Sequence, residues 1–256
     1  MKTSKALKDY HRRLVAHLEA SASAETAEWF TNYLKGAIQY RGLKTPQLRG
    51  VLKAFFAETG AEKLSSEIQL KHIRYWLAQP MAEDKLIAIL WLKNWLKVQG
   101  RGSDATEEIS LVPALLEDVF AAGDIHDWST NDWLCVRVLE TIVEKYPQLN
   151  GRLMGWLDAE PLWQRRSALL AFKKGGKQGL FHDEIAALIE GLLPSDERFI
   201  QTAVGWVLCD ASRNYPDWAS SLFEKHFDEL THEVIVRHTK YLDNHGDLKQ
   251  RSRERR

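Results

Sequence analysis

Apolar residues recur at steps of three and four along almost the whole of this chain, and two-residue alternation is nearly absent. This spacing predicts amphipathic α-helices and argues against β-strands. In the first helix the apolar stripe consists of Leu7, Tyr10, Leu14 and Leu18. We expect further helices at residues 25–39, 45–59, 66–76, 82–98, 105–122, 129–145, 147–157, 161–174, 180–193, 196–212, 216–229 and 231–243. The protein is therefore predicted to be all-α.

Local signals mark several of the expected helix ends. Thr45-Pro46 is typical of a helix start, with an N-cap residue followed by proline at the first helical position. Ser129, Ser195 and Thr231 are expected to cap later helices. The glycine-containing segment 100–104 is expected to be a flexible loop.

The predicted helices are short, are joined by short turns, and pair at intervals of about 35–40 residues, a period typical of helical repeats. We therefore expect an α-solenoid of stacked antiparallel helix pairs of the HEAT type, in which one row of helices lines a concave groove. Residues 1–248 would form this single domain. A globular helical bundle is the alternative architecture.

Lysine and arginine together number 35, as do aspartate and glutamate, so the formal net charge is zero. The last eight residues, 249–256, hold five bases and one acid and lack an apolar stripe, which predicts a disordered basic tail. A protein that binds nucleic acid normally has a basic excess. Any such surface in this chain has to arise from segregation of charges onto one face.

No run of apolar residues approaches the eighteen or so that a membrane helix needs, and the N-terminal segment lacks the apolar core of a secretion signal. We therefore expect a cytoplasmic protein with no membrane partner. Cys135 and Cys209 lie within helical patterns and form no metal-binding pair, and the nine histidines show no ligand spacing. No metal or cofactor is predicted.

Residues 126–133 join a loop to a strongly periodic helix and place two tryptophans around one carboxylate, that of Asp132. Asp132 stands at the head of the apolar stripe of this helix. The stripe continues through Cys135, Val136, Leu139 and Val143. Ser129 with an acid three residues later also forms a capping box, in which Asp132 has a structural role. Capping and catalysis are both open for this carboxylate.

Two further helices place charged or aromatic residues where a plain helix does not need them. Trp163 and Arg166 are three residues apart and share one helix face. Trp206 lies off the main apolar stripe of its helix, next to Gly205, which permits close approach of another group. A tryptophan in a helical protein is usually part of the core, and an arginine usually pairs with an acid, so these features alone are weak signals.

Two basic segments can reach an anion. The helix start at Lys44 and Thr45, shortly after Tyr33, has free backbone N–H groups that can hold a phosphate. The segment 173–179 is interpreted as a helix–helix turn, in which Lys173 and Lys174 are candidate contacts for a nucleic-acid backbone. Its glycine spacing differs from that of a phosphate-binding loop and no strand precedes it.

Four segments, taken in order, resemble the AlkD-like DNA alkylation-repair proteins, a family of DNA glycosylases built from HEAT-like repeats. The four segments are Tyr33 with Gly42 and Thr45-Pro46, Trp128 with Asp132, Trp163-Gln-Arg-Arg166, and the segment 200–208 that contains Gly205-Trp206. The resemblance covers about residues 25–243. The Trp-x-x-Arg and Gly-Trp-Val-Leu segments are the more specific matches.

The resemblance implies a basic groove that holds double-stranded DNA without flipping the damaged nucleotide, and excision of cationic N-alkylated purines. In the family's pattern Asp132 occupies the position of the catalytic carboxylate, and Trp128 and Trp206 flank the deoxyribose of the lesion. Tyr33 is a further aromatic residue at the site, and Arg166 contacts a backbone phosphate. The remaining expected DNA contacts are Lys44, Thr45, Trp163, Lys173 and Lys174. The protein is expected to act as a monomer.

The sequence departs from the family's pattern at two positions. The family's motif has an acid directly after the tryptophan and an aliphatic residue before the catalytic aspartate, whereas this chain has Ser129 and Asn131. A second tryptophan, Trp133, follows the acid. Relatives with this fold include proteins that bind unusual DNA without excising bases. Two alternatives to a glycosylase therefore stay open: a non-catalytic binder of damaged or branched DNA, and a protein–protein scaffold.

Overall fold

The computed structural model describes residues 2–99 and 105–255, so the predicted loop at residues 100–104 lies outside the described part of the chain. The chain divides into two compact units, Met1–Val138 (unit 1) and Leu139–Arg256 (unit 2). In the described residues all regular structure is helical, apart from one isolated β-bridge between Gln39 and Met81. The prediction of an all-α protein is confirmed. A single domain over residues 1–248 stays a prediction.

Unit 1 consists of short helices that follow the predicted apolar stripes. They are α1 (Lys2–Ala20), α2 (Ala24–Tyr33), α3 (Thr45–Thr59), η1 (Ala61–Lys63), α4 (Ser66–Leu77), α5 (Ala82–Gln99), α6 (Ala105–Ala121) and α7 (Trp128–Leu134). A π-helical turn, η2 (Cys135–Leu139), follows α7. No helix in the described part of the chain is long and apolar enough to span a membrane.

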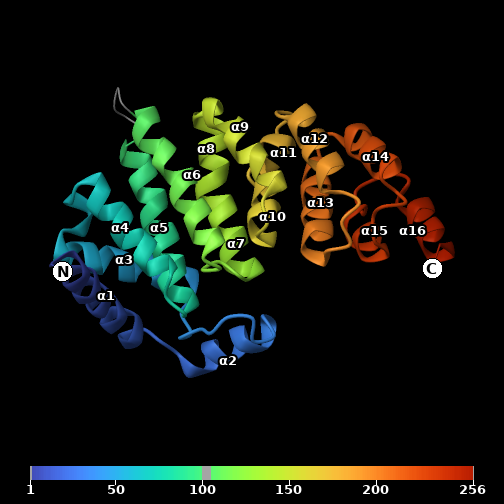
Figure 1. Ribbon diagram of the computed structural model, residues 1–256. Helices are drawn as coiled ribbons and strands as arrows, with labels where there is room; N and C mark the ends of the chain where they lie inside the picture. Colours follow the sequence, from blue (N-terminus) through green and yellow to red (C-terminus); the bar gives the residue numbers. More distant parts are fainter. Residues whose placement is uncertain (1, 100–104, 256) are drawn as a thin grey trace. The chain divides into compact units, whose positions relative to one another are not determined.

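The helices of unit 1 stack in two rows, as expected for HEAT-like repeats (Figure 1). One row contains α3, α5 and α7, since α3 packs on α5 and α5 packs on α7. The other contains α4 and α6, and α5 contacts both of them. Phe55, Trp76 and Trp91 fill the space between the rows and are at most 1% exposed. The predicted HEAT-like stacking is therefore confirmed.

The first turn of α5 is unusual because it buries Glu83, which is 0% exposed. Its carboxylate accepts hydrogen bonds from all three backbone N–H groups of residues 41–43, at 2.9, 2.8 and 3.1 Å. Gly42 within this loop has a φ of +100°, and a Cβ there would lie 2.0 Å from the carbonyl oxygen of Ser23. The loop before α3 is thus fixed by one buried acid and by a glycine that no other residue can replace without displacing backbone.

The next two residues of α5 are also charged and buried, and each has a partner, as a buried charge requires. Asp84 accepts a hydrogen bond from the guanidinium of Arg41 at 2.7 Å. Lys85 donates to the backbone carbonyls of Leu77 and Asp124, both at 2.6 Å. This turn therefore connects the segment before α3 with the loop that precedes α7.

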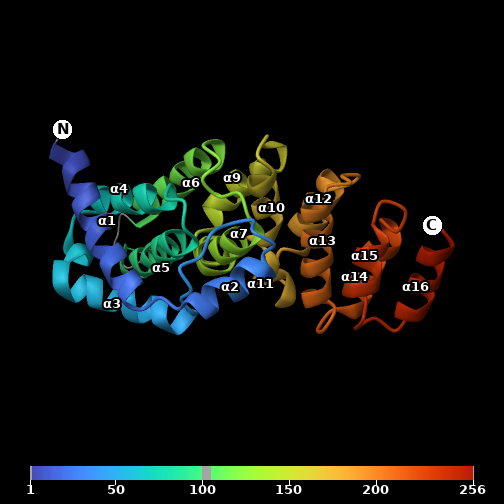
Figure 2. The same cartoon turned by 90° about the horizontal axis from the view of Figure 1, so that it is seen from below.

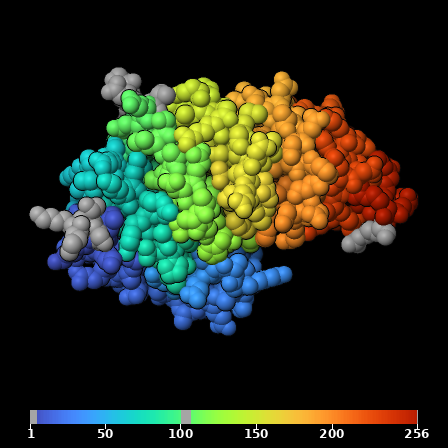
Figure 3. Space-filling model, in the orientation of Figure 1, coloured from blue at the N-terminus to red at the C-terminus, as the bar shows by residue number. Residues whose placement is uncertain are grey.

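Helix α2 differs from the other helices of unit 1 because none of its residues is buried. It ends at Tyr33 and not at the predicted residue 39, because Lys35 and Gly36 adopt left-handed conformations with φ values of 52° and 73°. Figures 1 and 2 show α2 at the edge of unit 1, away from α4 and α6. In the space-filling view this segment forms a projecting ridge (Figure 3).

Unit 2 is also built of stacked helices, and they are shorter and more interrupted than those of unit 1. They are α8 (Glu140–Lys145), η3 (Pro147–Leu149), α9 (Asn150–Met154), η4 (Gly155–Asp158), α10 (Leu162–Leu170), α11 (Lys173–Lys177), α12 (His182–Leu192), α13 (Arg198–Ala211), α14 (Pro216–Lys225), α15 (His232–His238) and α16 (His245–Glu254). Helix α13 is central in this unit, since it packs on α10, α11, α14 and α15.

Three predictions for unit 2 are wrong in detail. Residues 173–177 form the short helix α11, where a turn was expected. The N-cap of α13 is Glu197 and not Ser195, whereas Thr231 is the N-cap of α15 as predicted. The tail is not disordered, because residues 249–254 belong to α16 and Ser252 is only 1% exposed. Its anchoring is polar: Ser252 bonds to His232 at 2.9 Å, so an apolar stripe could not reveal it.

Candidate functional site

The N-terminus of α7 is capped by Asp127, which is 1% exposed. Its carboxylate accepts hydrogen bonds from the backbone N–H groups of Ser129 and Thr130, at 2.9 and 3.0 Å, and from the Thr130 hydroxyl. The prediction that Ser129 is the N-cap and Asp132 the third helical residue is therefore wrong. Asp132 lies in the body of α7, half-buried, and the cap is complete without it.

Asp132 shares one face of α7 with Trp128, since the two residues are four apart. The π-helical turn η2 begins three residues after Asp132 and changes the phase of the helix at that point. Cys135 and Leu139 of this turn are fully buried, as the apolar stripe predicted. Single π-helical turns inside α-helices occur frequently at functional sites.

The two departures from the family's pattern point into the protein. The hydroxyl of Ser129 lies 3.1 Å from the phenol oxygen of Tyr40. Tyr40 is 7% exposed, and this burial raises its pKa to about 12, so the phenol stays protonated. Asn131 is 0% exposed. Both side chains therefore contribute to the packing of α7, and neither is four residues from Trp128 or Asp132 on their shared face.

Tyr33 and Trp128, which the sequence predicted as site residues, are in contact. Their rings meet edge to face, with centroids 5.4 Å apart. On its other side Tyr33 stacks on Trp29, at 5.0 Å and an interplanar angle of 14°. Trp29 and Tyr33 are 57% and 56% exposed, which is unusual for large aromatic side chains. We name Trp29, Tyr33 and Trp128 the aromatic group.

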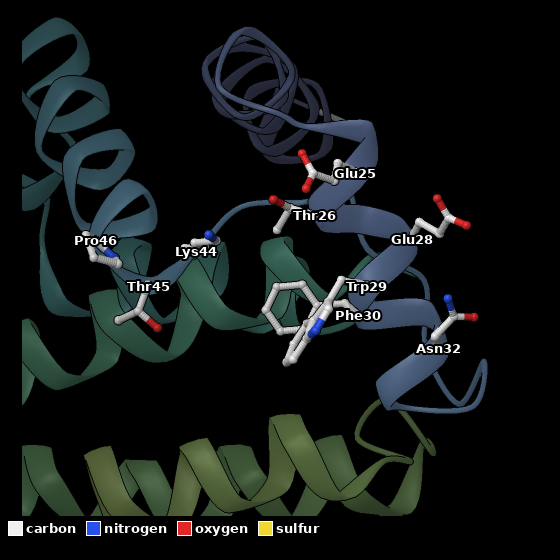
Figure 4. Close-up of a pocket in the computed structure, with 9 residues that line it drawn as sticks. All are labelled: Glu25, Thr26, Glu28, Trp29, Phe30, Asn32, Lys44, Thr45 and Pro46. Atoms are coloured by element: carbon white, nitrogen blue, oxygen red, sulfur yellow. The ribbon is translucent and has the colours of Figure 1, made fainter.

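A cleft of about 710 Å³ lies beside this group, between α2 and the start of α3 (Figure 4). Trp29 and Phe30 point into the cleft from α2, while Lys44 and Thr45 line it from the other side. Lys44 is the N-cap of α3, and its N–H donates to the Gln47 side chain at 2.8 Å, so Thr45 is the first helical residue and not the cap. The two predicted contact residues thus lie close to the aromatic group.

A group of cations lies on the α3–α5–α7 row and its continuation into η2, and we call it the basic cluster. Its members are Arg49, Lys53, Lys93, Lys97 and Arg137. Within residues 2–99 and 105–255, none of the five forms an ion pair. The pKa of Lys93 is lowered, first by partial burial and then by repulsion from Arg137, Arg49 and Lys97. A hollow of about 490 Å³ lies between the cations of α3 and those of α5.

Mutually repelling cations without counter-ions are costly to the folded protein and are typical of surfaces that bind anions. Arg137 is further held by Trp133, because its guanidinium lies 5.1 Å from the centre of the indole ring. The sequence analysis missed the whole basic cluster. A signal was present in the sequence, because Arg49 and Lys53, and likewise Lys93 and Lys97, are pairs of cations four residues apart on one helix face.

In unit 2 the predicted residues Trp163 and Arg166 both contact Phe199. The rings of Trp163 and Phe199 are 4.8 Å apart, and the guanidinium of Arg166 donates to the backbone carbonyl of Phe199. Arg166 also donates to the hydroxyl of Thr202 at 3.3 Å and is only 4% exposed. Arg166 therefore connects α10 to α13, a role that differs from the expected phosphate contact.

The predicted contact residues Lys173 and Lys174 both form ion pairs. The ammonium of Lys173 lies 3.2 Å from Asp210 and 3.3 Å from Glu140. It also lies 4.8 Å from the centre of the Trp206 ring, so two residues that the sequence singled out separately are in contact. Lys174 pairs with Glu144 at the surface. Sequence analysis missed Glu140 and Asp210, because neither lies near these lysines in the chain.

Comparison with known proteins bears on the family and the fold of the chain. A family model described as "DNA alkylation repair enzyme" matches residues 14–242. A solved structure described as "Predicted DNA alkylation repair enzyme from Enterococcus faecalis" has a similar fold, with a TM-score of 0.65, 22% sequence identity, and coverage of 80% of this chain and 90% of that one. No curated protein matches the chain. Because the family model covers most of the sequence, the chain belongs to the family of DNA alkylation repair enzymes.

Proposed function

We propose that this protein is a DNA glycosylase that excises cationic N-alkylated purines from double-stranded DNA without flipping the damaged nucleotide. The observation that carries this proposal is that two acids of the α7 segment have different positions, one at the N-cap and one in the helix body. Asp127 alone caps the helix, so the half-buried carboxylate of Asp132, on the same face as Trp128, has no capping role. A carboxylate in the helix body beside the aromatic group can stabilise positive charge on a bound substrate.

The chemistry suits these residue types. A purine alkylated at a ring nitrogen carries a positive charge, so it leaves without a strong general acid. Positive charge then develops on the deoxyribose. The carboxylate of Asp132 and the faces of Trp128 and Tyr33 stabilise that charge, and the carboxylate can also hold the attacking water. The resemblance assigns a further aromatic face at the lesion to Trp206.

The basic cluster of unit 1 supports binding to the DNA backbone. Five cations without ion pairs in the described residues would contact phosphates and release counter-ions from the DNA. The row of helices that carries them ends at the π-helical turn, three residues after Asp132. Lys44 and Thr45, at the start of α3, can extend these contacts toward the aromatic group. The neutral total charge of the chain therefore does not oppose DNA binding.

Release of free base tests the proposal. Methylated duplex DNA is incubated with the protein, and free 3-methyladenine and 7-methylguanine are measured by chromatography against a reaction without protein. We expect release above this background, together with DNA affinity that falls steeply with salt. Salt-dependent binding without base release would support a non-catalytic binder. Absence of DNA affinity at low salt would contradict both the glycosylase and the non-catalytic DNA binder, and would favour a protein–protein scaffold.

A further inference from the structure

Lys173, the first residue of α11, is enclosed by groups from two other helices, α8 and α13. Its ammonium lies 3.2 Å from the carboxylate of Asp210 in α13 and 3.3 Å from that of Glu140 in α8. The Trp206 ring of α13 lies beneath it, with the ring centre 4.8 Å from the nitrogen. The Lys173 side chain is only 12% exposed. Few lysines are this deeply buried, and those that are have defined partners.

These contacts make Lys173 a poor ligand for phosphate. Two carboxylates face one ammonium, so the group of Glu140, Lys173 and Asp210 has a net charge of −1 when both acids are ionised. A DNA phosphate that approached this group would meet an excess of negative charge and a lysine that already has partners. Lys177, in the same helix, is exposed and has no such environment.

The same contacts restrict the indole of Trp206. An ammonium over the face of a tryptophan stabilises that arrangement by roughly 0.5–2 kcal/mol, depending on how dry the site is. On the adjacent residue, Gly205, a Cβ would lie 2.5 Å from the ring of His238, so α15 packs directly against the backbone of α13 at this point. The position of the backbone and one face of the indole are thus both fixed, while Trp206 itself remains partly exposed.

We propose that Lys173 is a positioning residue for Trp206, which it holds in the orientation that the excision reaction uses, and that it is not a DNA contact. This inference builds on the proposed function, in which Trp206 faces the deoxyribose of the lesion. Glu140 and Asp210 hold the ammonium in place, and together the three groups carry an excess of negative charge beside Trp206. That excess favours the positive charge that develops on the sugar.

The test uses a double variant, Lys173→Met with Glu140→Gln. Lys173→Met alone would leave the buried carboxylate of Glu140 and the half-buried carboxylate of Asp210 without this partner, and could unfold the protein. The double variant keeps the net charge of the group at −1. Any change in Trp206 or in the excision rate is therefore due to loss of the contact between the Lys173 ammonium and the indole, and not to a change in charge. Lys173→Arg keeps a cation that can stack on the indole, and Lys177→Met is the matched control in the same helix.

The first measurement does not depend on activity. The protein contains ten tryptophans, and incorporation of 5-fluorotryptophan gives each a fluorine resonance. Trp206→Phe identifies the resonance of Trp206. We expect the double variant to shift or broaden this resonance, and Lys177→Met to leave it unchanged. An unchanged Trp206 resonance in the double variant would overturn the proposal.

The second measurement separates positioning from binding. With enzyme in excess over DNA, we expect the double variant to excise 7-methylguanine about tenfold more slowly, since small misplacements of a reacting geometry have costs of this size or larger. Affinity for DNA and its salt dependence should match the wild type, and Lys173→Arg should recover part of the rate. If affinity and salt dependence fall while the rate at saturation is unchanged, Lys173 is a phosphate contact. If the wild type releases no base, the proposed function fails, and the fluorine spectrum still decides whether Lys173 positions Trp206.

Discussion

The lysines of α11 and the cations of the basic cluster have the same charge, but they differ in whether carboxylates lie nearby. Lys173 and Lys174 each have a carboxylate within ion-pair distance. In the described residues of unit 1, no member of the basic cluster has one. The two units nevertheless contain nearly equal numbers of acidic and basic residues. The difference between them therefore comes from where the acids are placed and not from how many there are.

Two buried acids of unit 1 and the acids around α11 have different partners, although other acids of unit 1, such as Asp84 and Asp124, also pair with arginines. In unit 1 the carboxylates of Glu83 and Asp127 accept hydrogen bonds from backbone N–H groups. In unit 2 the carboxylates of Glu140, Glu144 and Asp210 bind lysines. An acid that is occupied by the backbone cannot neutralise a surface cation. Unit 1 thereby gains both a fixed loop structure and a surface with unpaired positive charge, although its composition is balanced.

The largest effect is expected in α7, where Asp127 caps the helix and Asp132 is proposed to act in catalysis. Asp132→Asn keeps the shape of the side chain and removes its charge. We expect excision of 7-methylguanine to slow by roughly a hundredfold or more, the usual scale for loss of a fixed transition-state charge partner. DNA affinity and melting temperature should change little, because Asp127 caps the helix.

Asp127→Ala is the matched variant for this experiment. It should lower the free energy of unfolding by about 1–2 kcal/mol, as loss of an N-cap does, because the N–H groups of Ser129 and Thr130 lose their acceptor. If Asp132→Asn excises at the wild-type rate and melts several degrees lower, then Asp132 is structural and the catalytic assignment is wrong.

A second experiment compares buried and surface acids directly. Glu83→Ala leaves three buried backbone N–H groups without an acceptor and should cost about 3 kcal/mol in the free energy of unfolding, measured with urea. Glu144→Ala in unit 2 removes only the exposed partner of Lys174 and should cost less than about 1 kcal/mol. Equal costs for the two variants would contradict the distinction between structural acids and pairing acids.

A third experiment tests the cations themselves. The double variant Arg49→Gln with Lys93→Gln removes two unpaired charges and should lower DNA affinity by roughly 10–50-fold near 0.1 M salt, with the salt slope reduced by about 2. Lys174→Gln with Lys225→Gln removes the same charge from two lysines that pair with Glu144 and Glu190. That pair should change affinity much less. If both double variants have the same effect, binding depends on net charge and not on the basic cluster.

The sequence was sufficient for the fold because helical periodicity is a local property. Each row of apolar residues at steps of three and four indicates the face that a helix buries. The sequence therefore predicted most helices of both units, with small errors at their ends. Two helices were predicted wrongly, for reasons that the spacing of apolar residues does not show. Helix α2 ends early because Lys35 and Gly36 turn left-handed, and α16 was missed because only Leu248 and Ser252 of its residues are buried.

The candidate site was only partly predictable, since its electrostatics depend on residues that are distant in the chain. The resemblance proposed Asp132, Trp128 and Tyr33 as site residues. Ser129 was predicted as the cap, whereas Asp127, whose residue type is an equally good N-cap, caps the helix. The pairing of Lys173 with Glu140 and Asp210 has no local signal. For the same reason the sequence could not show that the basic cluster lacks partners while the lysines of α11 have them.

The smallest expected effect concerns the basic residues at the C-terminus, which follow the pattern of unit 2. Arg251 pairs with Glu224 at 2.9 Å, and Arg255 donates to the backbone carbonyls of Phe227 and Leu230. Deletion of residues 249–256 should therefore lower the free energy of unfolding by about 1–2 kcal/mol, the sum of a few part-exposed polar contacts. Loss of Arg251 and Arg255 should change DNA affinity little, because both are occupied within the protein. Arg253→Gln, at an exposed position of the same helix, is the control and should leave stability unchanged. If the deletion lowers DNA affinity strongly and leaves stability unchanged, the cations of the tail contact DNA, as we propose for the basic cluster of unit 1. The difference between the two units would then not hold for the C-terminal residues.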